Sequence, residues 1–304
     1  MAKNAMDRLK KSLRGTKEWA SGRSFPITDF EEYLEGHGDV GAAVDGIFGL
    51  FALGMKEIKQ SLLAAGTGQW ASANQHLAHG FARMLYAEII DINNGKGSNR
   101  IKIGDLDGAT HLMLGAIATG QTELVKSYHE TLFASIEGGY GISDGHDLPL
   151  GTTLRYAAFG LTIIGDWLGQ PLDLEKHALP RDPAWGQLVA NWRTPDPDAL
   201  LPALLVACDT HVERIALTER EDDSGKFEFG SVFLAVHPTE ILAVLRLRDL
   251  LDLPNPSEID HPLMKTPYAA ITCLPGAITE HDELLDQFLA IVRQRDPHVL
   301  PSGF

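Results

Sequence analysis

Cysteine is scarce in this sequence of 304 residues, which contains only Cys208 and Cys273. The two cysteines lie far apart in the chain, and neither belongs to a C-x-x-C pair. A disulfide framework or an all-cysteine zinc site needs more cysteines, at closer spacing. The scarcity therefore argues against the disulfide-rich secreted class and fits a protein of the reducing cytoplasm.

Long apolar runs are missing as well. The first residues, MAKNAMDRLKKSLRGTKEWASGR, are basic but contain no continuous apolar core of the kind found in signal peptides. Elsewhere no segment approaches the roughly 18 uninterrupted apolar residues that indicate a membrane-spanning helix. We therefore expect neither export nor insertion into a membrane, and no membrane partner.

The sequence also lacks the common signatures of catalysis. It contains no G-x-x-x-x-G-K-[ST], no G-x-S-x-G and no H-E-x-x-H motif. The glycine-containing stretches GLFALG and GKGSNR are too short and too poorly placed to bind phosphate. We therefore expect no cofactor, no bound metal and no enzymatic activity.

Helical periodicity is what the sequence does contain. Apolar residues make up 44% of the chain, which is enough for a substantial core. Two series of apolar residues step by three and four, and the short glycine-containing join AAGTGQ between them favours an antiparallel helical hairpin. The first series is Val44, Ile47, Phe48, Phe51, Met55, Ile58 and Leu62, and the second is Trp70, Leu77, Phe81, Met84, Leu85 and Ile92.

Similar patterns predict helices along the rest of the chain, within residues 108–139, 152–169, 182–192, 196–215, 237–253 and 279–295. Proline near the start of three of them suits the first helical turn, whose amides lack intrahelical acceptors. Strand signals are few, and FEFGSVFLAV at 227–236 is the best of them. The fold class we predict is all-α, an irregular array of antiparallel helical hairpins with at most a minor β element.

The strongest loop composition is INNGKGSNRIKIGDLDG, at residues 92–108. Residues 1–304 are predicted to form a single α-helical domain. This stretch either divides that domain into an N-terminal helical part, 1–95, and a C-terminal part, 96–304, or forms a long surface loop.

Charge is unevenly distributed along the chain. Residues 1–23 carry a net +5, which leaves −20 on the remaining 281 residues out of a total of −15. An acidic body repels nucleic acid and attracts basic partners, although acidity also serves solubility alone. The basic segment is predicted to be a mobile arm or first helix rather than a nucleic-acid site, because it contains a single aromatic residue, Trp19.

A glycine-rich stretch, GGYGISDGHDLPLG at residues 138–151, contains the adjacent pair His146 and Asp147. Such a pair occurs in HD-type metal-dependent hydrolases, where carboxylate and imidazole hold an ion that activates water. The remaining ligands would come from His111 or His129 and from Asp166 or Asp209. Because the HD pair belongs on a helix, whereas this stretch has loop composition, we favour a turn in which Asp144 and Asp147 cap backbone amides.

Two other groups of polar residues have simpler structural interpretations. His76 and His79 share one helix face but have no third zinc ligand at a characteristic spacing, so we favour their interpretation as part of a polar helix face. Cys208 and His211 resemble a nucleophile and its base, but Cys208 falls in an apolar helical stripe and is predicted to be a small core residue.

Three stretches of the second half resemble a known family as a set. They are QLVANWRTPDPDALLPALLVACDTHVERI, HPTEILAVLRLRDLLDL and DHPLMKTPYA, within residues 184–270. Together they are similar to the helical immunity proteins of bacterial polymorphic-toxin and type VI secretion systems. The resemblance implies a cytoplasmic antidote that binds and occludes a co-encoded toxin. The matching residues look like fold determinants: Trp192, Cys208, His211, Pro238, Glu240, His261, Pro262 and Met264.

The charge of the body then suggests where a toxin would bind. A nuclease toxin must be basic to hold nucleic acid, so an acidic inhibitor would find it quickly through long-range attraction. We therefore predict that the toxin contacts the acidic loops, with an aromatic residue as an anchor. The protein could also form homo-oligomers. Two alternative functions stay open: an HD-type metal-dependent hydrolase and a helical protein-interaction scaffold. The predicted contact residues are Tyr140, Asp144, His146, Asp147, Glu219, Glu221, Asp222 and Asp223.

Overall fold

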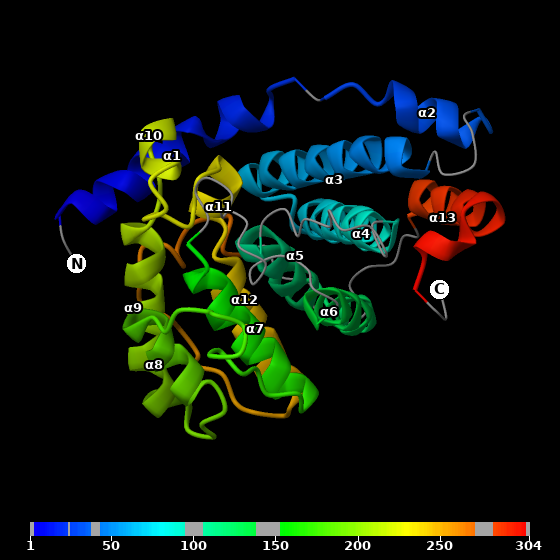
Figure 1. Cartoon of the computed structure of the whole chain (residues 1–304). Coiled ribbons are helices and arrows are strands. Elements are labelled where there is room, and N and C mark those ends of the chain that lie inside the picture. Colours follow the sequence, from blue (N-terminus) through cyan, green and yellow to red (C-terminus); the bar gives the residue numbers. More distant parts are fainter. Residues whose placement is uncertain are drawn as a thin grey trace.

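A computed structural model describes residues 3–23, 25–37, 43–94, 106–137, 153–270 and 282–301 of the chain (Figure 1). Within these residues, helices form all the regular secondary structure. The all-α fold predicted from the periodicity is confirmed. The α-helices are α1 Lys3–Ala20, α2 Thr28–Leu34, α3 Ala43–Gly66, α4 Trp70–Asn94, α5 Leu106–Ala118, α6 Thr122–Glu137, α7 Arg155–Leu168, α8 Pro183–Asn191, α9 Pro197–Glu213, α10 Glu219–Asp222, α11 Val232–Val236, α12 Thr239–Leu250 and α13 Glu283–Arg295, and a 3₁₀ turn, η1, follows at Pro297–Val299.

The two longest helices, α3 and α4, form the predicted hairpin. Gly68, with φ at +76°, closes the turn, and its amide donates to the carbonyl of Ala65. The helices approach closely because Gly54 faces Gly80: a Cβ on Gly54 would lie 2.9 Å from the carbonyl oxygen of Gly80. This close contact makes the hairpin the base on which α1 and α2 pack (Figure 1).

The buried apolar side chains form one continuous core, to which helices from α1 to α13 contribute. Helix α5 lies between α4 and α12 and connects the hairpin to the second half of the chain, where α8 and α9 pair at the outer edge (Figure 1). The predicted division near residue 95 falls outside the described ranges. None of the described helices has the length and hydropathy needed to cross a bilayer.

The best strand signal, residues 227–236, does not become a strand. Val232–Val236 is the short helix α11, whose first turn is capped where the Ser231 hydroxyl accepts from the amide of Leu234. Only Phe229 pairs in extended fashion, as an isolated bridge with Ile215. A short apolar run has no periodicity that separates helix from strand, so packing and the cap decide.

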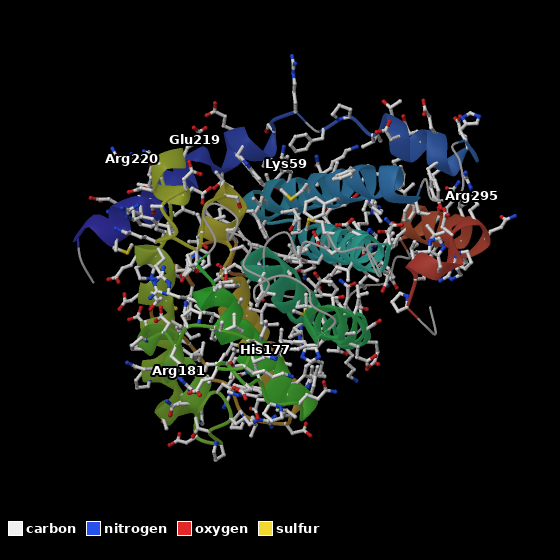
Figure 2. All side chains as sticks on the ribbon, in the orientation of Figure 1. Lys59, His177, Arg181, Glu219, Arg220 and Arg295 are labelled. Atoms are coloured by element: carbon white, nitrogen blue, oxygen red, sulfur yellow. The ribbon has the colours of Figure 1, made fainter. Side chains whose placement is uncertain are left out.

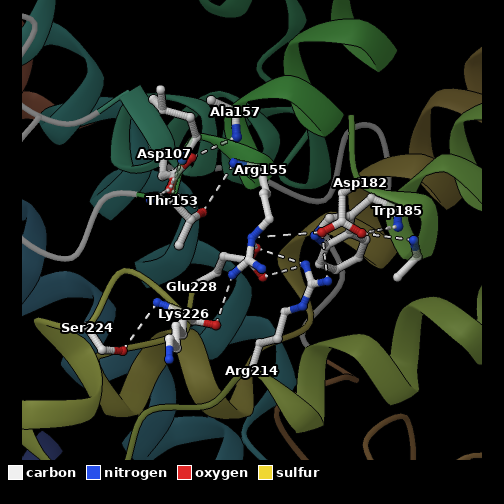
Figure 3. A network of polar contacts seen from close by, with 12 residues as sticks. Asp107, Thr153, Arg155, Ala157, Asp182, Trp185, Arg214, Ser224, Lys226 and Glu228 are labelled. Carbon is white, nitrogen blue, oxygen red and sulfur yellow. Dashed lines mark hydrogen bonds and ion pairs between the residues drawn. The ribbon is translucent and has the colours of Figure 1, made fainter. Parts of the chain in front are cut away.

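Asp107 on α5 fixes the start of α7 (Figure 3). One carboxylate oxygen accepts from the amides of Thr153 and Leu154 at 2.9 and 3.1 Å, and the other accepts from the amide of Ala157 at 2.9 Å. These amides lie just before α7 or in its first turn, where the helix itself offers no acceptor. A single side chain therefore sets where α7 begins and ties it to α5.

Four charged side chains hold the ends of α7, α8 and α9 together (Figure 3). Arg214 donates to Glu228 at 2.9 Å and to Asp182 at 2.7 Å, and Arg155 lies 3.1 Å from Glu228. Asp182 is also the N-cap of α8. Burial is the largest effect on Glu228 and raises its pKa, while the two guanidinium groups act in the opposite direction.

We expect replacement of Asp107 by alanine to lower the free energy of unfolding by about 3 kcal/mol, because buried amides at the start of α7 lose their acceptor. Urea denaturation followed by circular dichroism measures the change. Asp107→Asn, which keeps one acceptor oxygen, should cost less. Equal losses for the two variants would contradict this explanation.

Candidate partner-binding groove

An apolar groove opens between α3, α4 and the segment that leads into α2. It has a volume of about 750 Å³. Helix α3 supplies most of its floor, and Phe25 and Pro26 border it on the side of α2. Its lining residues are Phe25, Pro26, Asp29, Ile47, Phe48, Phe51, Ala52, Met55, Ala87, Glu88 and Asp91, and we call this the α3 groove.

Two phenylalanines make the α3 groove unusual. Phe48 is 74% exposed and Phe25 is 71% exposed. Among the described residues, the other exposed large apolar side chains are Trp70 and Leu250, which are 41% and 44% exposed and lie outside the groove. Covering one such ring is worth roughly 2 kcal/mol. Clustered exposed apolar side chains with polar residues at the edge are typical of interaction sites.

The sequence explains why this face is apolar. From Gly46 to Met55, α3 contains ten residues without a polar side chain. A helix that is apolar all round is normally covered all round. Helix α2 covers one side at Gly49, where an added Cβ would lie 2.3 Å from the Cβ of Phe30, and α4 covers another side at Gly54. The remaining side carries Phe48.

Phe48 belongs to the apolar series from which we predicted the hairpin. Ile47, Ile58 and Leu62 of that series are buried as expected. Phe51 and Met55 are half-buried and line the groove with Phe48. The groove was not predicted from the sequence, because the whole series was assigned to internal packing. The absence of polar side chains over residues 46–55 could have indicated that this part of α3 has an apolar face left over for a partner.

Acidic groups lie on both sides of the groove. Asp29 on α2 and Asp91 on α4 are exposed, Glu88 is half-buried, and no Lys or Arg is among the described lining residues. The surrounding protein raises the pKa of the Asp91 carboxyl through desolvation. Burial raises the pKa of the nearby Tyr128, and the charges of Glu88 and Asp91 raise it further. The charged side chains among the described lining residues of the groove are therefore all acidic.

Of the two predicted acidic loops, only the one at residues 219–223 lies within the described residues. Tyr140, Asp144, His146 and Asp147 lie outside the described residues, so their predicted role stays a prediction. Residues 219–222 form α10, and Figure 2 shows Glu219 at the outer surface beside α1. Glu219, Asp222 and Asp223 are exposed.

Glu221 is already bound within the molecule. Its two carboxylate oxygens accept from the Arg8 guanidinium of α1 at 2.8 and 3.0 Å, and one also accepts from the amide of Leu217 at 2.8 Å. The Arg8 hydrogen bond is the largest cause that lowers the pKa of Glu221, to about 2. Of the two predicted alternatives for the basic segment at the start of the chain, the first helix is confirmed, and its described residues do not form a mobile arm.

The residues considered as further HD ligands have separate surroundings. Asp166 accepts from the indole of Trp192 at 2.9 Å and from Arg193 at 2.7 Å, and Asp209 lies 3.3 Å from His261. His111 is buried beside Tyr156, and the ring of His129 contacts that of Phe133 at a tilt of 36°, with centroids 4.4 Å apart. Within the described residues, no three His, Cys, Asp or Glu side chains are placed to hold a metal ion.

The pair of histidines on α4 also has separate partners. The Nδ1 of His76 lies 2.5 Å from a carboxylate oxygen of Glu57, whose other oxygen accepts from Arg83 at 3.0 Å. His79 contacts Gln75 on its own helix. Both histidines therefore belong to the polar face of α4, as the simpler interpretation predicts.

Residues named in the family resemblance occupy the core of the second half. His211 and Glu240 are buried, with Nδ1 and Oε1 2.7 Å apart, and His211 stacks on Phe229 at 4.0 Å between ring centroids. Burial is the main cause that raises the pKa of the Cys208 thiol, so Cys208 is not an activated nucleophile. Pro262, in contrast, is exposed.

Fold and groove together define a helical protein with an open, acid-flanked apolar face. Neither a protein-family model nor a curated protein nor a solved structure matches the chain. The assignment of a function therefore depends on the groove, on charge and on the resemblance of residues 184–270.

Proposed function

We propose that this protein is an immunity protein that acts in the bacterial cytoplasm and neutralises a basic, co-encoded toxin by stoichiometric binding. The observation that carries the proposal is the α3 groove, where Phe25 and Phe48 are more than two-thirds exposed between acidic side chains. Exposed aromatic anchors of this kind supply most of the affinity in protein interfaces.

The overall charge supports the same kind of partner. The chain carries −15 in total, and the acidic side chains of the α2 region, Asp29, Glu31, Glu32 and Glu35, are all exposed, with Asp29 lining the groove. Long-range attraction would speed encounter with a basic toxin, and contact with the phenylalanines would then slow dissociation. The family resemblance supplies the toxin as the partner class.

Coexpression with the toxin encoded by the neighbouring gene tests this function. We expect a stable 1:1 complex by size-exclusion chromatography with light scattering, and cells that survive the toxin. Phe48→Asp should weaken the affinity measured by calorimetry at least 100-fold, or about 2.7 kcal/mol, because a charge replaces a central apolar anchor.

Trp70→Asp provides the matched control. Trp70 is 41% exposed and lies outside the groove, so the same change of residue type should leave affinity within about threefold. Circular dichroism should show an unchanged fold for both variants. The absence of any complex with the unaltered protein would refute the function, and equal losses for the two variants would refute the α3 groove as its site.

A further inference from the structure

We infer that the α3 groove receives an amphipathic helix whose apolar stripe has Lys or Arg residues on both sides. This inference rests on the proposed function, which supplies the toxin as the protein that carries the helix. The shape of the groove, its charges and the docking of α1 on the same protein are three separate observations that support it.

The floor of the groove has the spacing of a helix. Phe48, Phe51 and Met55 follow one another at intervals of three and four along α3, so their rings and thioether form one row. From Phe48 to Met55 this row extends about 11 Å along the axis, or two helical turns. An apolar ridge of similar length on a partner helix would fill it, as in other helix-in-groove complexes.

The acidic side chains beside the groove indicate which residues should lie on either side of the apolar stripe of the partner helix. Asp29 lies on the α2 side of the groove, and Glu88 and Asp91 lie on the α4 side. A helix placed along the apolar floor would therefore meet carboxylates on either side. Cations at these positions would also stabilise the charged form of Asp91, whose pKa is raised by desolvation within the protein.

Helix α1 shows how this protein binds such a helix. Its buried residues, Ala5, Leu9, Ser12, Thr16 and Ala20, recur every three or four positions and face the body. On the edge of that stripe, Arg8 forms a two-point ion pair with Glu221 and lies over the ring of Phe227, 4.8 Å from its centroid. The pattern is a buried stripe of small and apolar side chains, with Ser12 and Thr16 among them, and a flanking cation on an acidic, aromatic surface. We infer the same kind of contact for the groove.

A second copy of the chain fits the groove poorly. Two copies would bring like-charged grooves together, and the basic helix of each copy, α1, has its apolar face packed on its own body. A separate basic helix is the occupant that satisfies both the apolar floor and the acidic flanks.

The test uses the full chain and a fluorescein-labelled synthetic peptide of about 15 residues, long enough to form a helix, with leucines at i, i+3, i+4 and i+7 and lysines elsewhere. Fluorescence anisotropy at physiological ionic strength measures affinity. A matched peptide with glutamate in place of lysine should bind at least 30-fold more weakly. Phe48→Asp should weaken binding of the lysine peptide at least 30-fold, and Asp91→Lys about tenfold.

Glu219→Lys is the control for net charge, since it makes the same change on exposed α10, away from the groove. It should change peptide affinity less than twofold. Equal effects of Glu219→Lys and Asp91→Lys would show general attraction to an acidic protein and overturn the inference. A concentration-dependent dimer that Phe48→Asp dissociates would overturn it as well, in favour of a second copy.

Comparison with the toxin experiment separates the two proposals. Toxin binding that depends on Phe48, without binding of the lysine peptide, would reject the helical ligand and leave the immunity function standing. Peptide binding that depends on Phe48 and Asp91, without any toxin complex, would reject the immunity function and support the groove as a site for basic helices.

Discussion

Glu240→Ala should lower the free energy of unfolding by about 4 kcal/mol, since it removes one partner of a buried hydrogen-bonded pair, leaves His211 unsatisfied and opens a cavity in the core. Glu240 and His211 are both fully buried, with Oε1 and Nδ1 2.7 Å apart. The other ring nitrogen of His211 lies 3.3 Å from the carbonyl oxygen of Ala235. Both neighbours are hydrogen-bond acceptors, so the imidazole joins α9 to the segment that contains α11 and α12.

Urea denaturation measures this loss, and Glu240→Gln is the matched variant. Glutamine is uncharged but keeps an acceptor for His211, so about half of the lost free energy of unfolding should be recovered. Because Glu240 is fully buried, partner affinity per folded molecule should stay unchanged. A loss of affinity in fully folded Glu240→Gln would contradict the assignment of this residue as a fold determinant.

Acidification from pH 7 to pH 5 should lower the free energy of unfolding by about 4 kcal/mol through two buried histidines. Burial is the main cause that lowers the pKa of His111 to about 3, assisted by His237 and His211, and burial lowers the pKa of His129 to about 4. In the unfolded chain both imidazoles titrate near pH 6.5. The unfolded state therefore binds about two more protons below that pH, and stability decreases as pH falls from 6.5 towards 4.

His129→Phe provides the direct check. Both ring nitrogens of His129 are buried without a hydrogen-bond partner in the described structure, and the ring contacts Phe133 in a tilted arrangement. Phenylalanine should keep this ring contact and remove about half of the acid-dependent loss, measured by urea denaturation at several pH values. The exposed His298 is solvated in both states, so His298→Gln should leave the profile unchanged. An unchanged profile for His129→Phe would refute the explanation.

The periodicity of apolar residues was sufficient to predict the helical hairpin of α3 and α4 and the all-α class. Helical propensity and a periodic stripe are local properties, so they appear directly in the sequence. The prolines near the starts of α8, α9 and α12 were equally informative. The run at 227–236 misled because a five-residue apolar helix and a buried strand have the same composition.

Charge was harder to interpret, because a charged residue in the sequence does not reveal its partner. Arg8 and Glu221 are separated by 213 positions, and only the packing of α1 brings them together. This pairing ties Glu221 to α1, whereas Glu219, Asp222 and Asp223 are exposed, and the toxin contacts of all four residues stay a prediction. Asp29 and Asp91, which flank the α3 groove, belong to separate helices and had no common motif.

By itself the sequence determined the helical class, the acidic character and the apolar stripe of α3, since composition and short-range spacing fix these properties. The tertiary structure decided which parts of that stripe are covered. Phe30 fills the side of α3 at Gly49, and Met84 fills the side at Gly54. Phe48 stays exposed, because a side chain is buried only when another element packs against it, and among the described residues none covers that face of the helix.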